Sequence, residues 1–261
     1  MYAFRSVTGK ENSLIKLVSA LQSSAKARRE NGLFVLEGLR ICDDAADNGI
    51  RFDKLIVSET ALLKYDEYIG RFAENSEDCV RVTDSLFKKI SDTSSPQGVI
   101  AVCKSGSTPS YEIDRSGRYI VLENVADPSN LGAVSRTAEA LGASGIILTA
   151  GGCDPYSPKA LRASMGTLLR VPVIVTDNLP ELISQNGLKA YACVVDKNAS
   201  PISSVTFSDG CAVMIGNEAN GLTESAVNAA TQSVTIPMQG RAESLNAAAA
   251  AAIAVWEMMR Q

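Results

Sequence analysis

The sequence predicts an α/β protein with two domains: a smaller N-terminal α/β domain, and a C-terminal domain built on a parallel sheet covered by helices. Short apolar runs alternate with helix-compatible segments along most of the chain. The runs of the C-terminal half are apolar on both faces, as in buried parallel strands. Between the two series lies a segment, 104–117, that is rich in Ser, Gly and Pro. We therefore expect domains at residues 1–104 and 118–261, joined by a linker at 105–117.

The N-terminal domain is expected to open with an amphipathic helix. Between residues 13 and 21 the apolar side chains recur at helical spacing, and Ser13 is a suitable N-cap. Helix-compatible segments also begin near Leu39, Thr60 and Asp84. Apolar runs that predict four strands lie at residues 33–36, 55–57, 80–82 and 99–103.

The C-terminal domain should hold six parallel strands. The runs that predict them lie at residues 119–122, 145–148, 171–175, 190–195, 212–215 and 234–236. In open parallel sheets, ligands bind outside the carboxyl ends of the strands. Three of the segments that follow these strands have unusual residues: 123–132, 216–222 and 237–246. We expect the chemistry of the protein in these three loops.

Composition excludes several classes of function. The chain has no histidine, so Ser-His-Asp triads, Cys-His pairs and most zinc sites are excluded. Its six cysteines are at least 18 residues apart, without a CxxC pattern, and we expect reduced core thiols and no metal. Neither a signal-peptide core nor an apolar run long enough for a bilayer is present. We expect a cytoplasmic protein with no membrane partner.

Charge is distributed unevenly along the chain. The net charge of −4 argues against a protein that coats nucleic acid without selectivity. Residues 1–29, however, have six basic side chains and one acid, Glu11, which gives a local charge of +5. Within this segment Lys26, Arg28 and Arg29 are candidate contacts for RNA phosphates.

The glycines of the chain do not form a dinucleotide-binding fingerprint. A Rossmann site needs GxGxxG directly after a strand, and neither 142–145 nor 151–152 supplies it. Taken singly, the Gly and Asn residues of the three loops are ordinary turn formers. Their occurrence together in three such loops is harder to explain by turns alone.

Three segments resemble the signature motifs of the SpoU family of knotted RNA methyltransferases, in the family's order. They are DPSNLGAVSRTAEALG from Asp127, IGNEANGL from Ile215 and IPMQGRAESLNAAAA from Ile236. The resemblance extends to SPKALRASMGTLLRVP at 157–172. FVLEG from Phe34 and PQGVIAV from Pro96 resemble an L30e-like RNA-binding domain, although this match is less specific.

The resemblance implies a fold, a cofactor and an assembly. In this family the C-terminal segment of a parallel α/β domain passes through a loop to form a deep trefoil knot, which sequence reasoning alone does not predict because threading is rare. The family's cofactor is S-adenosylmethionine, held in a bent shape by the backbone of the knot loops. The motif positions that should hold it are Gly216, Ile236, Met238, Leu245 and Asn246. The resemblance also implies a homodimer that involves the last helix.

The implied reaction moves a methyl group to a ribose 2′-hydroxyl, and the hydroxyl must lose its proton as it attacks. In the family Arg136 is the proposed activator, helped by Asn130. A guanidinium is a poor base because its pKa exceeds about 12. We therefore expect Arg136 to orient and acidify the hydroxyl, with an RNA phosphate as proton acceptor. Glu218 either holds Arg136 or is itself the base, and both possibilities stay open.

Other polar residues have two interpretations each. Ser244 and Asn246 flank the start of the last helix, where they cap it or meet a ligand. Lys159 and Arg162 lie in a helix that begins near Pro158, where they contact phosphate or are simply exposed. Ser164 and Gly166 match a small-residue patch of the family, and their alternative role is close packing.

The leading hypothesis is thus an S-adenosylmethionine-dependent methyltransferase acting on a ribose 2′-hydroxyl of RNA. Ribosomal RNA is favoured over transfer RNA because of the added N-terminal domain, an argument by analogy. One rival is a knotted RNA-binding protein without transfer activity, which the presence of Asn130, Arg136, Glu218 and Asn246 disfavours. Another rival is base methylation by a relative of the same superfamily.

Overall fold

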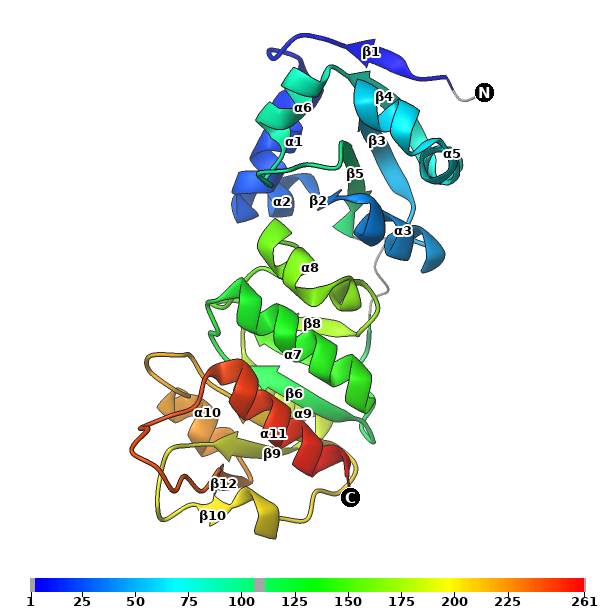
Figure 1. Ribbon diagram of the computed structural model, residues 1–261. Coiled ribbons are helices and arrows are strands. Elements are labelled where there is room, and N and C mark those ends of the chain that lie inside the picture. The colour runs from blue at the N-terminus through cyan, green and yellow to red at the C-terminus, as the bar shows by residue number, and fades with distance from the viewer. Residues whose placement is uncertain (1–2, 106–110, 261) are drawn as a thin grey trace. The chain divides into compact units, whose positions relative to one another are not determined.

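A computed structural model describes residues 3–105 and 111–260, which form two compact units (Figure 1). The first unit comprises the chain up to residue 105 together with Tyr156–Arg162. The second comprises Tyr111–Pro155 and the chain from Ala163 onward. Of the expected linker, residues 106–110 lie outside the described residues. The part from residue 111 belongs to the second unit, where the Asp114 carboxylate closes a turn by accepting hydrogen bonds from the N–H and hydroxyl of Ser116.

The first unit is built on a mixed sheet with the order β1-β4-β3-β5-β2. Strand β4 runs parallel to β1 and β3, whereas β5 is antiparallel to β2 and β3. The strands are β1 (Arg5–Val7), β2 (Leu33–Glu37), β3 (Phe52–Ser58), β4 (Ser76–Val82) and β5 (Val99–Lys104). The four predicted strands are confirmed. The short edge strand β1 was not predicted, because three residues with one buried side chain give no periodic signal.

Six helices cover this sheet within the described residues. They are α1 (Ser13–Ser23), α2 (Ala25–Asn31), α3 (Leu39–Asp47), α4 (Glu59–Lys64), α5 (Asp66–Glu74) and α6 (Asp84–Ile90). The predicted amphipathic helix is α1, which buries Leu14, Val18 and Leu21 in the core. Its N-cap is Asn12 rather than Ser13, because the Asn12 side chain accepts the Leu14 N–H at 2.9 Å.

The second unit contains a sheet whose described strand pairs are all parallel, in the order β10-β12-β9-β11-β6-β7-β8. The predicted parallel sheet is therefore confirmed. Its strands are β6 (Arg118–Leu122), β7 (Gly145–Thr149), β8 (Val173–Thr176), β9 (Lys189–Cys193), β10 (Ser200–Pro201), β11 (Cys211–Ile215) and β12 (Gln232–Thr235). Strand β10 was not predicted, since it has only two residues.

Helices lie on both faces of this sheet (Figure 1). Helices α7 (Pro128–Leu141) and α11 (Ala247–Met259) pack side by side on one face, with α11 over β6 and β11 and α7 over β7. Helices α9 (Leu179–Asn186) and α10 (Glu224–Ala229) pack together on the other face, in a core with Tyr119, Val121 and Met214. The remaining elements are α8 (Pro158–Ser164) and the 3-10 turns η2 (Thr167–Leu169) and η3 (Ile202–Ser204).

The sheet order brings the three predicted loops to one edge. Strands β6, β11 and β12 are parallel, and β11 lies between β6 and β9, which pairs with β12. The loops after β6, β11 and β12 therefore leave the sheet at the same carboxyl edge. Two of them lead directly into α7 and α11, whose contact places their N-terminal ends near the loop after β11.

Candidate functional site

The loop after β11 is a closed turn. Asn217 and Gly221 exchange two backbone hydrogen bonds of 3.0 and 2.9 Å, and Gly221 has a left-handed φ of 68°. The Asn217 side-chain oxygen also accepts the N–H groups of Ala219 and Asn220, at 3.0 and 3.1 Å. The loop thus satisfies its own backbone donors and keeps a fixed shape without helix or sheet.

Gly216 is required at the entrance to this loop. A Cβ added there would lie 2.1 Å from the carbonyl carbon of Gly221 and 2.2 Å from the nitrogen of Leu222. These are backbone atoms, which cannot move aside as a flexible side chain can. Only glycine allows the two ends of the loop to approach so closely.

The Glu218 carboxylate joins this loop to the loop after β6. It accepts the N–H groups of Ala126 and Asp127, at 3.1 and 3.2 Å, and the side-chain amide of Asn130 at 2.7 Å. Nearby, the amide of Asn217 donates to the carbonyl of Asn124 at 2.8 Å. Two backbone donors in front of α7 are therefore satisfied by an anion, an arrangement that the helix dipole also favours.

These hydrogen bonds determine the ionisation of Glu218. Burial is the largest single influence and raises the pKa of the carboxyl. The hydrogen bonds from Ala126 and Asn130 act in the opposite direction, and together with weaker ones they lower the pKa below its ordinary value of 4.5. Glu218 is therefore an ionised acceptor at neutral pH.

Asn130 and Asn246 continue the network toward α11. The amide of Asn246 donates to the side-chain oxygen of Asn130 at 3.0 Å. The oxygen of Asn246 accepts from Ala248 and Ala249 at 2.9 and 3.2 Å, so Asn246 is the N-cap of α11. The structure thus joins three of the four predicted catalytic residues, Glu218, Asn130 and Asn246, in one hydrogen-bonded chain.

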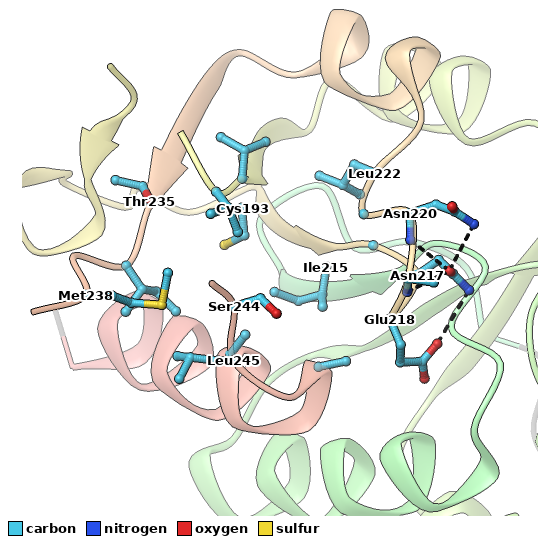
Figure 2. Close-up of a pocket in the computed structure, with 18 residues that line it drawn as sticks. Cys193, Ile215, Asn217, Glu218, Asn220, Leu222, Thr235, Met238, Ser244 and Leu245 are labelled. Atoms are coloured by element: carbon cyan, nitrogen blue, oxygen red, sulfur yellow. Dashed lines mark hydrogen bonds between the residues drawn. The ribbon is translucent and has the colours of Figure 1, made fainter. Parts of the chain in front are cut away.

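A cavity of about 430 Å³ lies beside this network (Figure 2). Its lining comes from the ends of β9, β11 and β12 and from the start of α11. Of the residues predicted to hold a cofactor, Gly216, Ile236, Met238 and Leu245 line it. Asn246 does not line it and acts as the adjacent helix cap, whereas Ser244, the other candidate for the cap, is a lining residue.

Sequence reasoning missed part of this lining. The cavity is also lined by residues 193–195, at the end of β9, and by Thr235, the last residue of the neighbouring strand β12. The rule that ligands bind at the carboxyl ends of parallel strands pointed to them, but no unusual residue distinguished the loop after β9. Burial raises the pKa of the Cys193 thiol to about 12, so this wall of the cavity is uncharged.

Comparison with known proteins identifies the family. Residues 117–256 match the sequence profile of the SpoU rRNA methylase family. The chain is 30% identical, over 237 residues, to the 23S rRNA (guanosine(2553)-2′-O)-methyltransferase RlmP of Bacillus subtilis, a match that covers 89% of this chain and 91% of that protein. The chain belongs to the SpoU rRNA methylase family. In addition, residues 12–101 match the profile of the MRM3-like substrate binding domain, at the place of the expected L30e-like domain.

A solved structure and a second relative extend the similarity over both units. The AdoMet-bound rRNA methyltransferase from Sinorhizobium meliloti has 28% sequence identity and a TM-score of 0.85, and the match covers 98% of each chain. The 23S rRNA (uridine(2479)-2′-O)-methyltransferase of Streptomyces viridochromogenes is 27% identical over 99% of this chain and 93% of its own. The predicted family and fold class are thereby confirmed.

Arg136 stands apart from the network of this SpoU-family protein. It lies on α7, six residues beyond Asn130, and its side chain is exposed. Six residues correspond to about 600° of helical rotation, so the two side chains leave the helix about 120° apart. Within the described part of the chain Arg136 has no hydrogen bond or ion pair, and none joins it to Glu218. The alternative in which Glu218 holds Arg136 is therefore not what the structure contains.

The predicted RNA contacts of the first unit fall into two groups. Lys26 and Arg29 are exposed on α2, and Lys26 lies 3.7 Å from Glu30, one turn further along the helix. Arg28, in contrast, is buried, with 6% of its surface exposed, and donates to the carbonyl of Leu21 at 2.6 Å. A guanidinium in this position joins α2 to α1 and is not presented to solvent.

Lys159 and Arg162 both lie on α8, as expected from the helix predicted at Pro158. Lys159 is exposed. Arg162 donates to the carboxylate of Asp92 at 2.6 Å, so its charge already has a partner. Phosphate binding by Arg162 would have to compete with this ion pair.

The described residues contain neither a membrane-spanning helix nor a cluster of metal ligands. No helix in residues 3–105 or 111–260 is long and apolar enough to cross a membrane. In the same ranges no group of three or more Cys, Asp or Glu side chains is arranged to hold a metal ion. All six cysteines are free thiols, three of which are buried.

Proposed function

We propose that this SpoU-family protein is an S-adenosylmethionine-dependent methyltransferase that acts on a ribose 2′-hydroxyl of ribosomal RNA. One observation carries the proposal: the chain of hydrogen bonds from Glu218 through Asn130 to Asn246 joins the three family motifs and runs beside a cavity lined by the second and third of them. The relatives named above support the assignment to ribosomal RNA and to the ribose.

The cavity fits S-adenosylmethionine. Its volume of about 430 Å³ falls in the range of small-molecule sites. Gly216 and the apolar side chains of Met238 and Leu245 leave backbone groups accessible beside polar side chains such as Asn217 and Ser244, which suits a folded cofactor. When bound, the cofactor supplies a sulfonium methyl group as the electrophile. The N–H groups and side chains of the loops after β11 and β12 bind and orient it.

Arg136 acts on the nucleophile. As the ribose oxygen attacks, its O–H bond breaks and the proton leaves for an acceptor, which we assign to a phosphate oxygen of the RNA. The guanidinium orients the hydroxyl and stabilises the developing negative charge, because it stays protonated. Glu218 is a positioning residue and not the base, since its oxygens already accept four hydrogen bonds and its pKa is lowered.

RNA is positioned by exposed cations. We assign phosphate contacts to Lys26 and Arg29 of α2 and to Lys159 of α8, all of which are exposed. Arg28 is buried between two helices, and the Arg162–Asp92 ion pair at 2.6 Å is shorter than the exposed Lys26–Glu30 pair at 3.7 Å. Arg28 and Arg162 are therefore not included among these contacts.

A homodimer is part of the proposal. Helix α11 exposes Ala249, Ile253 and Trp256 along one face, at the i, i+4 and i+7 positions. Trp256 is 55% exposed, and α7, which presents Arg136, packs beside α11. A second copy that covers this face would remove the apolar surface from water and approach Arg136.

Three further features belong to the same proposal. The C-terminal segment passes through a loop to form the deep trefoil knot of the family, and the packing of α11 on α7 supports this. The linker occupies residues 105–117. The protein acts in the cytoplasm.

The deciding experiment supplies purified protein with labelled S-adenosylmethionine and ribosomal RNA from cells that lack the protein. We expect one nucleotide to gain a 2′-O-methyl group, located by its resistance to alkaline hydrolysis. Labelling of a base would replace the ribose assignment, and labelling of transfer RNA alone would replace ribosomal RNA. If the protein binds RNA but transfers no methyl group, the rival function, RNA binding without catalysis, would replace the proposal.

A further inference from the structure

The sheet of the first unit has a cavity of its own at its carboxyl edge. Strands β3 and β4 end there at Ser58 and Val82, and β5 begins there at Val99. A cavity of about 350 Å³ is lined by the end of β3, by α4, by the start of α6 and by residues 96–98. All of its lining belongs to the first unit, so it is separate from the cofactor cavity.

The walls of this cavity are fixed by interactions between its elements. The Asp84 carboxylate accepts the N–H of Thr60 at 3.2 Å and its hydroxyl at 2.7 Å, which joins α4 to α6. Ser58 donates its N–H to the carbonyl of Gly98 at 2.8 Å and caps α4 through its hydroxyl. The cavity is therefore preformed, which lowers the entropic cost of binding a ligand.

Gly98 keeps the cavity open. It has a left-handed φ of 83°, and a Cβ there would lie 2.5 Å from the Ser58 hydroxyl and 2.6 Å from the Cβ of Ala61. The neighbouring Gln97 points its side-chain oxygen at the N–H of Leu39, at 2.9 Å, and so caps α3 as well as lining the cavity. This loop is thus held on two sides.

The chemistry of the lining suits a nucleotide. Lys64 and Lys88 are both exposed lining residues, and neither forms an ion pair within the described ranges. The ammonium of Lys64 lies 5.1 Å from the ring centre of Tyr65, also a lining residue. The hydrogen bond from Thr60 and, less strongly, the charge of Lys88 lower the pKa of Asp84. The lining thus combines two cations, hydroxyl groups, an aromatic ring and one carboxylate that is already hydrogen-bonded to Thr60.

We infer that this cavity binds one unpaired nucleotide of the RNA substrate, with its phosphate on Lys64 and Lys88 and its base against Tyr65. Unpaired bases stack on aromatic side chains, while lysines neutralise the backbone. A duplex offers its bases only in stacked pairs, and a cavity of about 350 Å³ has no room for one. The inference rests on the proposed function, because it takes RNA as the substrate.

The chain offers a matched pair of variants for the test. Lys88 and Lys89 are adjacent exposed residues of α6, but only Lys88 lines the cavity. Lys88→Ala should weaken the binding of a 12-nucleotide single-stranded RNA by the full-length protein roughly fivefold, and lower the salt slope by about 0.7. Lys89→Ala should change affinity less than twofold. S-adenosylmethionine affinity should be the same in both variants, and a duplex of the same length should not distinguish them.

Photocrosslinking gives a second readout that does not depend on substitution. With 4-thiouridine in the single-stranded RNA, adducts should map to residues 58–65 and 84–98, and uridine monophosphate should compete with them. Equal effects of Lys88→Ala and Lys89→Ala, or adducts only elsewhere, would overturn the inference while leaving methyl transfer intact. A wild-type protein that binds S-adenosylmethionine but no RNA would overturn the proposed function and this inference together.

Discussion

Glu218 shows how one side chain organises a site. Its carboxylate accepts two backbone N–H groups that precede α7 and the amide of Asn130. Asn130 in turn accepts from Asn246, which caps α11. Polar side chains therefore fix three loops that are distant in sequence. An amide or a carboxylate is needed at each position, because each of these groups must supply hydrogen bonds of defined geometry to its neighbours.

Arg136→Lys tests the residue assigned to the nucleophile. Lysine keeps the charge but loses the planar fork that contacts a hydroxyl and a phosphate together, so single-turnover methyl transfer should fall by about two orders of magnitude. Affinity for S-adenosylmethionine and the melting temperature should barely change, since Arg136 is exposed. Arg170→Lys is the control. Arg170 pairs with Glu139, which lies on α7 as Arg136 does, so the control also changes an arginine that contacts this helix. Transfer at the wild-type rate would move the role away from Arg136.

Glu218→Gln tests whether this residue positions or accepts the proton. Glutamine keeps the size of the side chain but gives up one acceptor, so S-adenosylmethionine should bind about tenfold more weakly, as expected for a lost charge-assisted hydrogen bond.

The pH dependence of the wild-type rate separates the two roles of Glu218. The pKa of Glu218 is lower in the folded protein than its ordinary value of 4.5. The carboxylate's contribution to folding stability is therefore complete above the ordinary pKa and is lost as pH falls through the lower pKa of the folded state. If Glu218 only positions the loops, its ionisation does not change between about pH 6 and 8. Any pH dependence of the single-turnover rate in that range should then be the same in the wild type and in Glu218→Gln. A rise of rate with pH in that range that disappears in Glu218→Gln would identify Glu218 as the base.

At the scale of elements, α11 combines two tasks. Its first turn is capped by Asn246 beside the cofactor cavity, and its alanines permit close packing on α7. Its outer face exposes Ile253 and Trp256, at 37% and 55%. A helix with small residues inward and large apolar residues outward is suited to a second contact surface.

Trp256→Glu tests that surface. The proposed dimer buries the Trp256 indole, and a charge in its place disfavours association. The proposal therefore predicts that the wild type sediments as a dimer and Trp256→Glu as a monomer at the same concentration. Leu63→Glu is the control: Leu63 is 86% exposed but lies on α4 of the first unit. If Trp256→Glu sediments like the wild type, α11 does not form the interface.

At the scale of the whole molecule, each unit has a hydrophobic core of its own. One core packs α1 and α6 on the first sheet, and another packs α9 and α10 on the second. Independent cores are the condition for units that fold alone. The loops and the cavity assigned to the cofactor lie wholly in the second unit.

A fragment of residues 110–261 should therefore fold and bind S-adenosylmethionine, as measured by calorimetry with circular dichroism as the check on folding. Helix α8 loses partners in this fragment because Tyr156–Arg162 group with the first unit, so some loss of stability is expected. The fragment 1–105 should not bind the cofactor. A folded C-terminal fragment without affinity at millimolar cofactor would show that the site needs more than this unit, and a full-length protein without affinity would contradict the cofactor assignment.

The sequence by itself determined the α/β class, the predicted strands and the three loops, because hydrophobic periodicity and turn residues are local signals. It also supplied the motif resemblance that the family match confirms. The sequence did not predict strand β1, the two-residue strand β10 or the N-cap at Asn12. A short edge strand and the choice between adjacent caps depend on packing.

Only the tertiary structure decided which side chains meet. Asn130 and Glu218 are 88 positions apart, yet 2.7 Å separates their amide nitrogen and carboxylate oxygen. Arg28 and Arg29 are neighbours in a basic segment, but one is buried and the other exposed. Pairing across such distances depends on strand order and helix orientation, which arise from packing of the whole chain and leave no trace in the spacing of residues.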